Sequence, residues 1–152
     1  MLLKTHIIVT LFFILILLSY VNDRIIFIFV SLFSAILPDI DSRFSKIGQK
    51  RISRILQFFT KHRGIIHSYT LLLIITIIFV LFIPLIALPF FLGYGLHLLA
   101  DSFTLTGIKP FYPFKKKISG KIKTGGKLEK AILVLFGASD LVLILTKISS
   151  IF

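Results

Sequence analysis

The chain carries four histidines, and each has a carboxylate, a hydroxyl or an arginine close to it in the sequence: His6, His62, His67 and His97. Such polar groups are costly to hold in apolar surroundings unless they are paired, so their presence in a chain rich in Ile, Leu and Phe needs a reason. Neutral imidazole and carboxylate groups are ligands of divalent transition metals. The sequence therefore predicts a metal site.

His97 and Asp101 are four residues apart, which predicts that they share one face of a helix. At this spacing the Cβ atoms are about 5 to 6 Å apart, so the two side chains could ligate one metal ion or two adjacent ions. The alternative is a simple hydrogen bond between the imidazole and the carboxylate.

Asp39 and Asp41 are two residues apart, directly after Pro38. They would lie on one side of an extended backbone and on opposite sides of a helix. The alternative role for this segment is helix capping, for which one acceptor such as Asp39 or Ser42 suffices.

The segment from His62 to Ser68 combines two potential ligands with Arg63 and with Gly64. A guanidinium group suits a bidentate grip on phosphate or carboxylate, and glycine lets the backbone approach a ligand closely. The alternative is an interfacial arginine that reaches lipid headgroups beside two solvated histidines. Glu129 has an alternative of its own, because it follows a glycine-rich loop and an acid is favoured in the first turn of a helix.

Composition indicates an integral membrane protein. The 152 residues are 57% hydrophobic and include 17 phenylalanines, and the mean hydropathy is +1.01. A soluble domain could not bury this much apolar surface, and several apolar runs approach the roughly 20 residues that span a bilayer. The chain has no cysteine, so a transition metal would be held by imidazole and carboxylate groups alone.

Five apolar segments predict an all-α bundle that crosses the membrane several times, as a single domain over residues 1–152: 7–21, 25–37, 65–83, 85–103 and 131–148. The second is short for a span, so we expect it to tilt little or to form a partly buried re-entrant piece. Pro84 and Pro89 predict a tight turn over residues 85–88, because proline disfavours helix in the residue before it. In residues 43–61 apolar residues repeat at helical spacing and basic residues occupy another face. This pattern predicts an amphipathic helix that lies in the membrane interface.

Basic residues indicate how the bundle is oriented. Seven lie between positions 39 and 64 and eight between 106 and 130, whereas the turn after the first segment carries only Arg24. The positive-inside rule then places both basic loops and the N-terminus in the cytoplasm. The net charge of +12 is explained by this topology and by anionic headgroups, so we expect no nucleic-acid partner.

This orientation brings all four histidines to the cytoplasmic side, together with four of the six acidic residues: Asp39, Asp41, Asp101 and Glu129. Residues far apart in the sequence would thus meet at one depth of the bundle, as a site between helices requires.

The ordered set of motifs resembles the membrane-bound metal-dependent hydrolases, inner-membrane proteins also described as LexA-binding. The resemblance covers residues 5 to about 130 and rests on Thr5-His6, on Leu37-Pro38-Asp39-Ile40-Asp41-Ser42, on His62-Arg63-Gly64-Ile65-Ile66-His67-Ser68, on Gly95-Leu96-His97-Leu98-Leu99-Ala100-Asp101-Ser102 with Thr104 and Gly107, and on Thr124-Gly125 with Glu129.

That family is in turn similar to zinc-dependent phospholipase C enzymes, which are helical. The similarity implies metal ligands at His6, Asp41, His67, His97 and Asp101. His62 and Glu129 are further candidate ligands from their own chemistry. The chain lacks the later histidines that complete the three-metal site of the soluble enzymes. We therefore expect one or two divalent ions, with zinc as the first candidate.

The expected function is metal-dependent hydrolysis of a lipid-type phosphoester at the cytoplasmic face of the inner membrane. The ion would activate water and stabilise charge on the phosphoryl group. Asp39 is the candidate general base or outer partner of a ligand, and Arg63 the candidate grip on the substrate. The alternative is a non-catalytic membrane protein whose polar cluster binds metal or docks a cytoplasmic regulatory protein.

Overall fold

The computed structural model describes residues 1–44 and 63–149, and it describes side chains only outside positions 40–64. The described residues form the helices α1 (Leu3–Leu17), α2 (Arg24–Phe44), α4 (Arg63–Ile66), α5 (Tyr69–Phe82), α6 (Pro84–Ser102) and α7 (Lys127–Ser149). Isolated β-bridges occur in the α6–α7 loop, and no named strand forms in the described part. The expected all-α class is confirmed.

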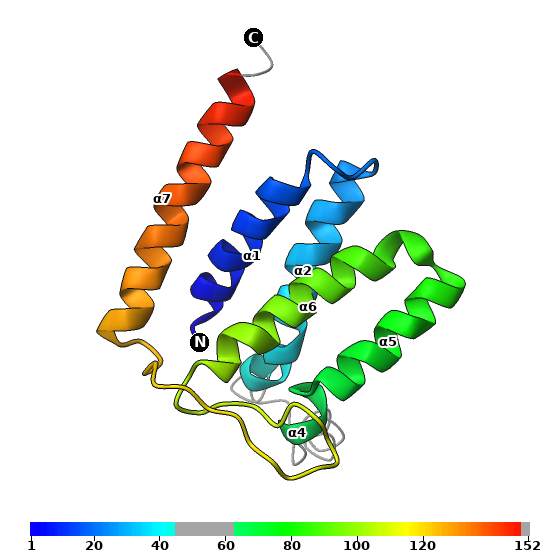
Figure 1. Ribbon diagram of the computed structural model, residues 1–152, viewed down its shortest axis with the longest axis vertical. Helices are drawn as coiled ribbons and strands as arrows, with labels where there is room; N and C mark the ends of the chain where they lie inside the picture. The colour runs from blue at the N-terminus through cyan, green and yellow to red at the C-terminus, as the bar shows by residue number, and fades with distance from the viewer. Residues whose placement is uncertain (45–62, 150–152) are drawn as a thin grey trace.

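Helix α6 lies at the centre of the bundle (Figure 1). It packs against α1, α2 and α5, while α7 packs chiefly along α1. Because successive long helices run in opposite directions, the starts of α1 and α7 meet the ends of α2 and α6 at one end of the bundle. We call this the N-terminal end; the C-terminus and the α1–α2 turn lie at the other.

A close crossing joins α2 to α6. A Cβ atom built on Gly93 would lie 2.0 Å from the carbonyl oxygen of Ser31 and 2.3 Å from Ser34 Oγ. Small residues at such crossings let two backbones approach, and they are enriched at helix contacts in membrane proteins. The crossing fixes the register in which α2 presents its C-terminal end to α6.

The second apolar segment forms a longer helix than the sequence predicts. Instead of ending near Leu37, α2 continues through Pro38 and Asp39 to Phe44 and spans 21 residues. Proline is tolerated within membrane helices because neighbouring groups satisfy the freed carbonyl. Asp39 therefore lies inside a helix rather than in a loop after it.

The predicted turn over residues 85–88 is wrong, because these residues form the first turn of α6. The chain reverses at Ile83 instead, and Pro84 begins the helix, where its missing N–H costs nothing. Pro89 lies inside α6 and is buried. At the other end of the hairpin, Ser68 caps α5 by accepting a hydrogen bond from the Leu71 N–H at 3.3 Å.

A buried apolar cluster lies between α5, α6 and the loop after α6. Its buried members are Leu72, Phe90, Tyr94, Leu98 and Ile108. Leu72 and Leu98 have no exposed surface, so α5 and α6 pack tightly at the depth of the polar residues described below.

Two helices of the described part, α6 and α7, are long and apolar enough to cross a membrane, fewer than the five segments the sequence suggests. α1 and α5 are apolar but have only 15 and 14 residues. The interfacial helix expected over residues 43–61 falls outside the described residues, apart from the two positions that end α2.

Candidate metal centre

Four polar side chains from three parts of the fold converge at the N-terminal end of the bundle. They are Asp39 on α2, His67 in the turn between α4 and α5, and His97 and Asp101 on α6. Each offers one ligand atom, and these atoms all lie within 4.8 Å of one another. The sequence-based prediction that residues distant in the chain meet at one depth is therefore matched by these four; we call them the His/Asp cluster.

Distances within the His/Asp cluster fit a shared cation better than direct hydrogen bonds. The Nε2 atom of His97 lies 3.6 Å from Asp101 Oδ2 and 3.9 Å from Asp39 Oδ1. His67 Nε2 lies 3.8 Å from Asp39 Oδ1 and 3.9 Å from Asp101 Oδ2. Two ligands bound at about 2.0 to 2.2 Å to a tetrahedral ion would be about 3.3 to 3.6 Å apart, close to these separations.

A buried imidazole nitrogen without a hydrogen-bond partner supports the same interpretation. Among the described atoms, His97 Nε2, the nitrogen that faces Asp39 and Asp101, is buried and has no such partner. Buried polar atoms are paired in the great majority of structures, and an orphaned group calls for an ion, a water or another function. The donor set therefore suits a divalent metal of the zinc type.

The orientation of the His97 ring is fixed by a hydrogen bond to the main chain of α2. Its Nδ1 atom lies 2.8 Å from the carbonyl oxygen of Ala35. A carbonyl oxygen can only accept, so Nδ1 carries the proton and the lone pair of Nε2 faces the carboxylates. Metal-binding histidines commonly have their second nitrogen held in this way.

His6 lies beside the His/Asp cluster rather than within it. Its ring stacks on that of His97 with centroids 4.0 Å apart, and its Nε2 atom is 3.3 Å from Asp101 Oδ1. Asp101 thus directs one oxygen toward His6 and the other toward His67 and His97. The amino group of Met1 also pairs with Asp101 Oδ1.

Glu129, one of the predicted ligands, lies outside the His/Asp cluster in the structure. One carboxylate oxygen accepts hydrogen bonds from the Leu2 N–H at 2.5 Å and from Thr5 Oγ1 at 2.9 Å. The other accepts from the Gly125 N–H at 2.5 Å. Because both oxygens are occupied in this way, Glu129 instead joins the first turn of α7 to the start of α1, the helix that carries His6.

Three predicted site residues lie outside the described side chains. His62 lies outside the described residues, and Asp41 and Arg63 are described only as positions in α2 and α4. Residues two apart on an α-helix are rotated by about 200° around its axis, so positions 39 and 41 occupy different faces of α2. The ligand role of Asp41 and the substrate role of Arg63 stay predictions.

Two contacts that support the cluster were not predicted from the sequence. One is the Ala35 carbonyl, which carries no side-chain signal. The other is Tyr94, whose hydroxyl donates a hydrogen bond to the carbonyl oxygen of Ile66 at 2.5 Å and so ties α6 to the residue before His67. The position of Tyr94, three residues before His97, could have suggested a shared helix face.

A helical bundle with two potential membrane spans and a His/Asp cluster at one end defines a membrane protein with a candidate metal centre. The chain belongs to the YdjM inner membrane protein family, whose family model matches residues 1–149. The inner-membrane part of the resemblance seen in the sequence is thereby confirmed.

One relative of the chain comes from Bacillus subtilis (strain 168) and is described as uncharacterized protein YvsG. It is 32% identical over 105 residues, which are 65% of this chain and 66% of the relative. The match therefore covers slightly less than two thirds of that protein's length. No solved structure matches the chain.

Proposed function

We propose that the chain is a metal-dependent hydrolase of the inner membrane that acts on a phosphoester of a lipid-type substrate. The observation that carries this proposal is the convergence of Asp39, His67, His97 and Asp101 with all four ligand atoms within 4.8 Å of one another. The His/Asp cluster lies at the N-terminal end of the bundle rather than at its middle. This position suits a reaction at the membrane surface better than transport through the bilayer, which uses sites near the midplane.

Zinc is the metal that we propose for the cluster. Imidazole suits zinc, and the two neutral imidazoles and two carboxylates of the cluster would balance the charge of one divalent ion. His97 and Asp101 would hold it from α6, and His67 from the α4–α5 turn. When bound, such an ion supplies Lewis acidity and lowers the pKa of water.

Asp39 is the residue that we propose to accept a proton from the attacking water. Its side chain is 26% exposed, whereas that of His97 is fully buried, so the cluster is more open on the side of Asp39. A general base must lie within hydrogen-bond reach of the water that it deprotonates, and water can approach from the more exposed side of the cluster. Asp39 meets this requirement better than the other carboxylate, because Asp101 faces three histidines.

Arg63 is the residue that we propose to hold the anionic oxygens of the substrate. It begins α4, which ends at Ile66, directly before His67. A guanidinium group cannot ligate a cation but binds phosphate oxygens in a bidentate manner.

The membrane arrangement that we propose has α1, α2 and α5 crossing the bilayer beside α6 and α7, with the N-terminal end of the bundle in the cytoplasm. The basic residues near this end support the orientation through the positive-inside rule. A headgroup in the cytoplasmic leaflet would then lie at the depth of the cluster, which favours a lipid-borne substrate.

The test is hydrolysis by zinc-loaded protein in detergent, measured against a phospholipid, a prenyl phosphate and a generic phosphodiester. We expect turnover of at least one of them. Asp39→Asn should lower kcat by about 100-fold or more, within the range of general-base contributions. Asp140→Asn is the matched control, because Asp140 is also a buried carboxylate but lies on α7, outside the cluster.

Arg63→Lys should keep the metal and lower kcat/KM by about tenfold, which corresponds to about 1.4 kcal/mol of transition-state binding. A zinc-loaded wild type that hydrolyses none of the three substrates, yet binds a cytoplasmic protein, would favour the non-catalytic alternative.

A further inference from the structure

The loop of residues 103–126 joins α6 to α7, the two helices that are long and apolar enough to cross a membrane. A segment that connects two spans must lie at a membrane surface, whichever side that is. We call this segment the basic loop, because it contains no acidic residue and six lysines: Lys109, Lys115, Lys116, Lys117, Lys121 and Lys123.

The basic loop has a defined shape. Ile108 and Ile118 exchange two backbone hydrogen bonds, each 2.9 Å long, and the Ile122 N–H donates to the Phe103 carbonyl at 3.0 Å. Gly107 has a φ of +59°, and a Cβ atom there would lie 2.2 Å from the Ile118 carbonyl oxygen. The Tyr69 N–H anchors the loop to α5 by donating to the Pro110 carbonyl at 2.8 Å. Its side chains are therefore presented in a fixed arrangement.

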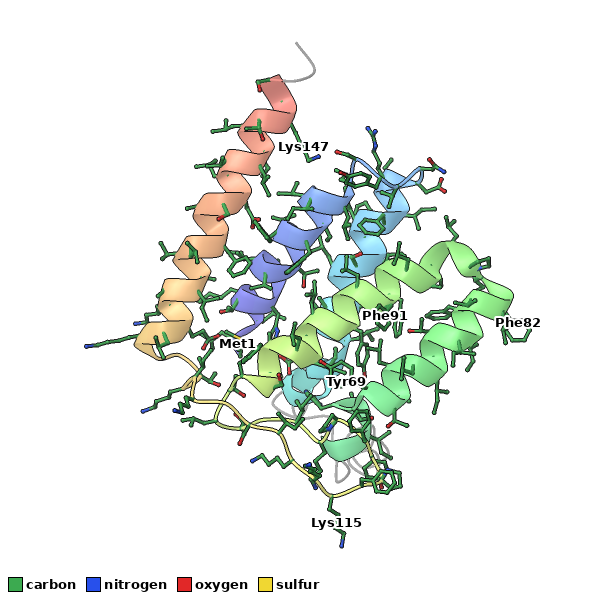
Figure 2. The ribbon with its side chains drawn as sticks, in the orientation of Figure 1. Met1, Tyr69, Phe82, Phe91, Lys115 and Lys147 are labelled. Atoms are coloured by element: carbon green, nitrogen blue, oxygen red, sulfur yellow. The ribbon has the colours of Figure 1, made fainter. Side chains whose placement is uncertain are left out.

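The loop buries one side and exposes another. Ile108 is inserted into the core cluster, and Thr104 and Pro110 are also buried. All six lysines are exposed, and large apolar side chains lie exposed among them: Phe103, Leu105, Phe111, Phe114 and Ile118. Figure 2 shows Lys115 extending from the loop away from the helices at the N-terminal end.

This combination indicates the chemistry of the partner. Phe114 is 72% exposed and directly precedes three consecutive lysines. A partner of this surface must therefore offer apolar contacts for the ring and negative charge for the lysines. The boundary between acyl chains and anionic headgroups offers both, and basic segments next to spans bind such headgroups. Nucleic acid would match the lysines, but a loop tethered at both ends to spans is already at headgroup depth.

We propose that the basic loop is a docking surface for anionic phospholipid headgroups of the leaflet that adjoins the His/Asp cluster. The lysines contact the phosphates, and Phe111 and Phe114 enter the upper acyl region. The surface would enrich anionic lipid around the site, and this binding requires neither metal nor hydrolysis, so it can be tested separately from the proposed function.

The chain has no tryptophan, so a single Phe114→Trp substitution gives a clean fluorescent probe. The full-length variant is placed in phosphatidylcholine nanodiscs that contain an equal small fraction of brominated lipid, either phosphatidylglycerol or phosphatidylcholine. We expect stronger quenching by the brominated anionic lipid. Tyr20→Trp, an exposed aromatic position at the other end of the bundle, is the control and should show no preference between the two quenchers.

Neutralising the neighbouring charges with Lys115→Gln, Lys116→Gln and Lys117→Gln should abolish the preference at position 114. Raising the salt concentration on the unneutralised Phe114→Trp variant should weaken it, which tests the charge dependence without further substitutions. Equal quenching by both lipids overturns the proposal, as does a preference that survives both treatments. An oligonucleotide that shifts the emission in phosphatidylcholine nanodiscs, where anionic lipid gives no preference, would identify nucleic acid as the partner instead.

Discussion

His97 on α6 donates its Nδ1 hydrogen to the main-chain carbonyl oxygen of Ala35 on α2, with the two atoms 2.8 Å apart. This bond fixes the tautomer of His97 and points its second nitrogen toward Asp39 and Asp101. The direction of a candidate ligand on one helix thus depends on how closely a second helix packs against it. We therefore expect that a change that separates α2 from α6 also weakens metal binding at the proposed centre.

Gly93→Ala tests this dependence. The added Cβ would lie 2.0 Å from the Ser31 carbonyl oxygen, so α2 and α6 must separate. We expect a loss of about 1 to 3 kcal/mol in stability, as for other overpacked interiors, together with weaker zinc binding. Both are measured by thermal unfolding in detergent with and without zinc.

Gly95→Ala is the matched control on the same helix. Its added Cβ would meet only Leu72 Cδ2 at 3.5 Å, which is an ordinary contact. We expect stability and zinc binding to stay near the wild type. Equal behaviour of the two variants would show that the crossing does not set the geometry of the cluster.

Glu129→Ala should loosen the start of α1 from the start of α7. The change leaves three donors without their acceptor, and of these the Thr5 hydroxyl is buried, whereas Leu2 and Gly125 are exposed to water. A buried unsatisfied group costs about 1 to 3 kcal/mol. We expect a lower unfolding temperature with zinc still bound, because Glu129 is outside the His/Asp cluster. Lys130→Ala, an exposed neighbour, serves as the control. Loss of zinc at unchanged stability would restore Glu129 as a ligand.

The positions of the helices could be predicted from the apolar segments, because each of the five segments corresponds to one long helix. Their ends were harder to predict: α2 passes through Pro38, and α6 begins at Pro84 and includes Pro89. In soluble proteins proline usually ends a helix, but in a packed membrane bundle neighbouring groups can compensate for its missing hydrogen bond.

The meeting of His67, His97 and Asp101 could be predicted in outline, because the positive-inside rule predicts that these residues lie near the same membrane surface. Which other carboxylates join these three residues could not be predicted. The sequence predicts Glu129 as a ligand and Asp39 as a general base, yet Asp39 joins the cluster and the packing of α1 against α7 directs Glu129 to backbone donors. The Ala35 carbonyl has no sequence signature at all, since every residue carries one.

The proposed orientation predicts opposite labelling of the two ends of the bundle. The chain has no cysteine, so Ser119→Cys and Tyr20→Cys each introduce a single thiol at an exposed position. In intact cells, a membrane-impermeant maleimide should label Tyr20→Cys and leave Ser119→Cys unlabelled until the cells are opened. The reverse pattern would move the His/Asp cluster to the outer face and remove the cytoplasmic leaflet as the source of substrate.

The metal content of the purified protein tests the central claim most directly. Elemental analysis should find at least one zinc ion per chain in the wild type and in the control Asp140→Asn, whose substitution lies outside the cluster. Asp101→Asn and His97→Ala should lose the ion while circular dichroism shows that the helices remain, because each removes a direct ligand. Equal zinc content in all four proteins, or none in the wild type, would contradict a metal centre formed by the His/Asp cluster.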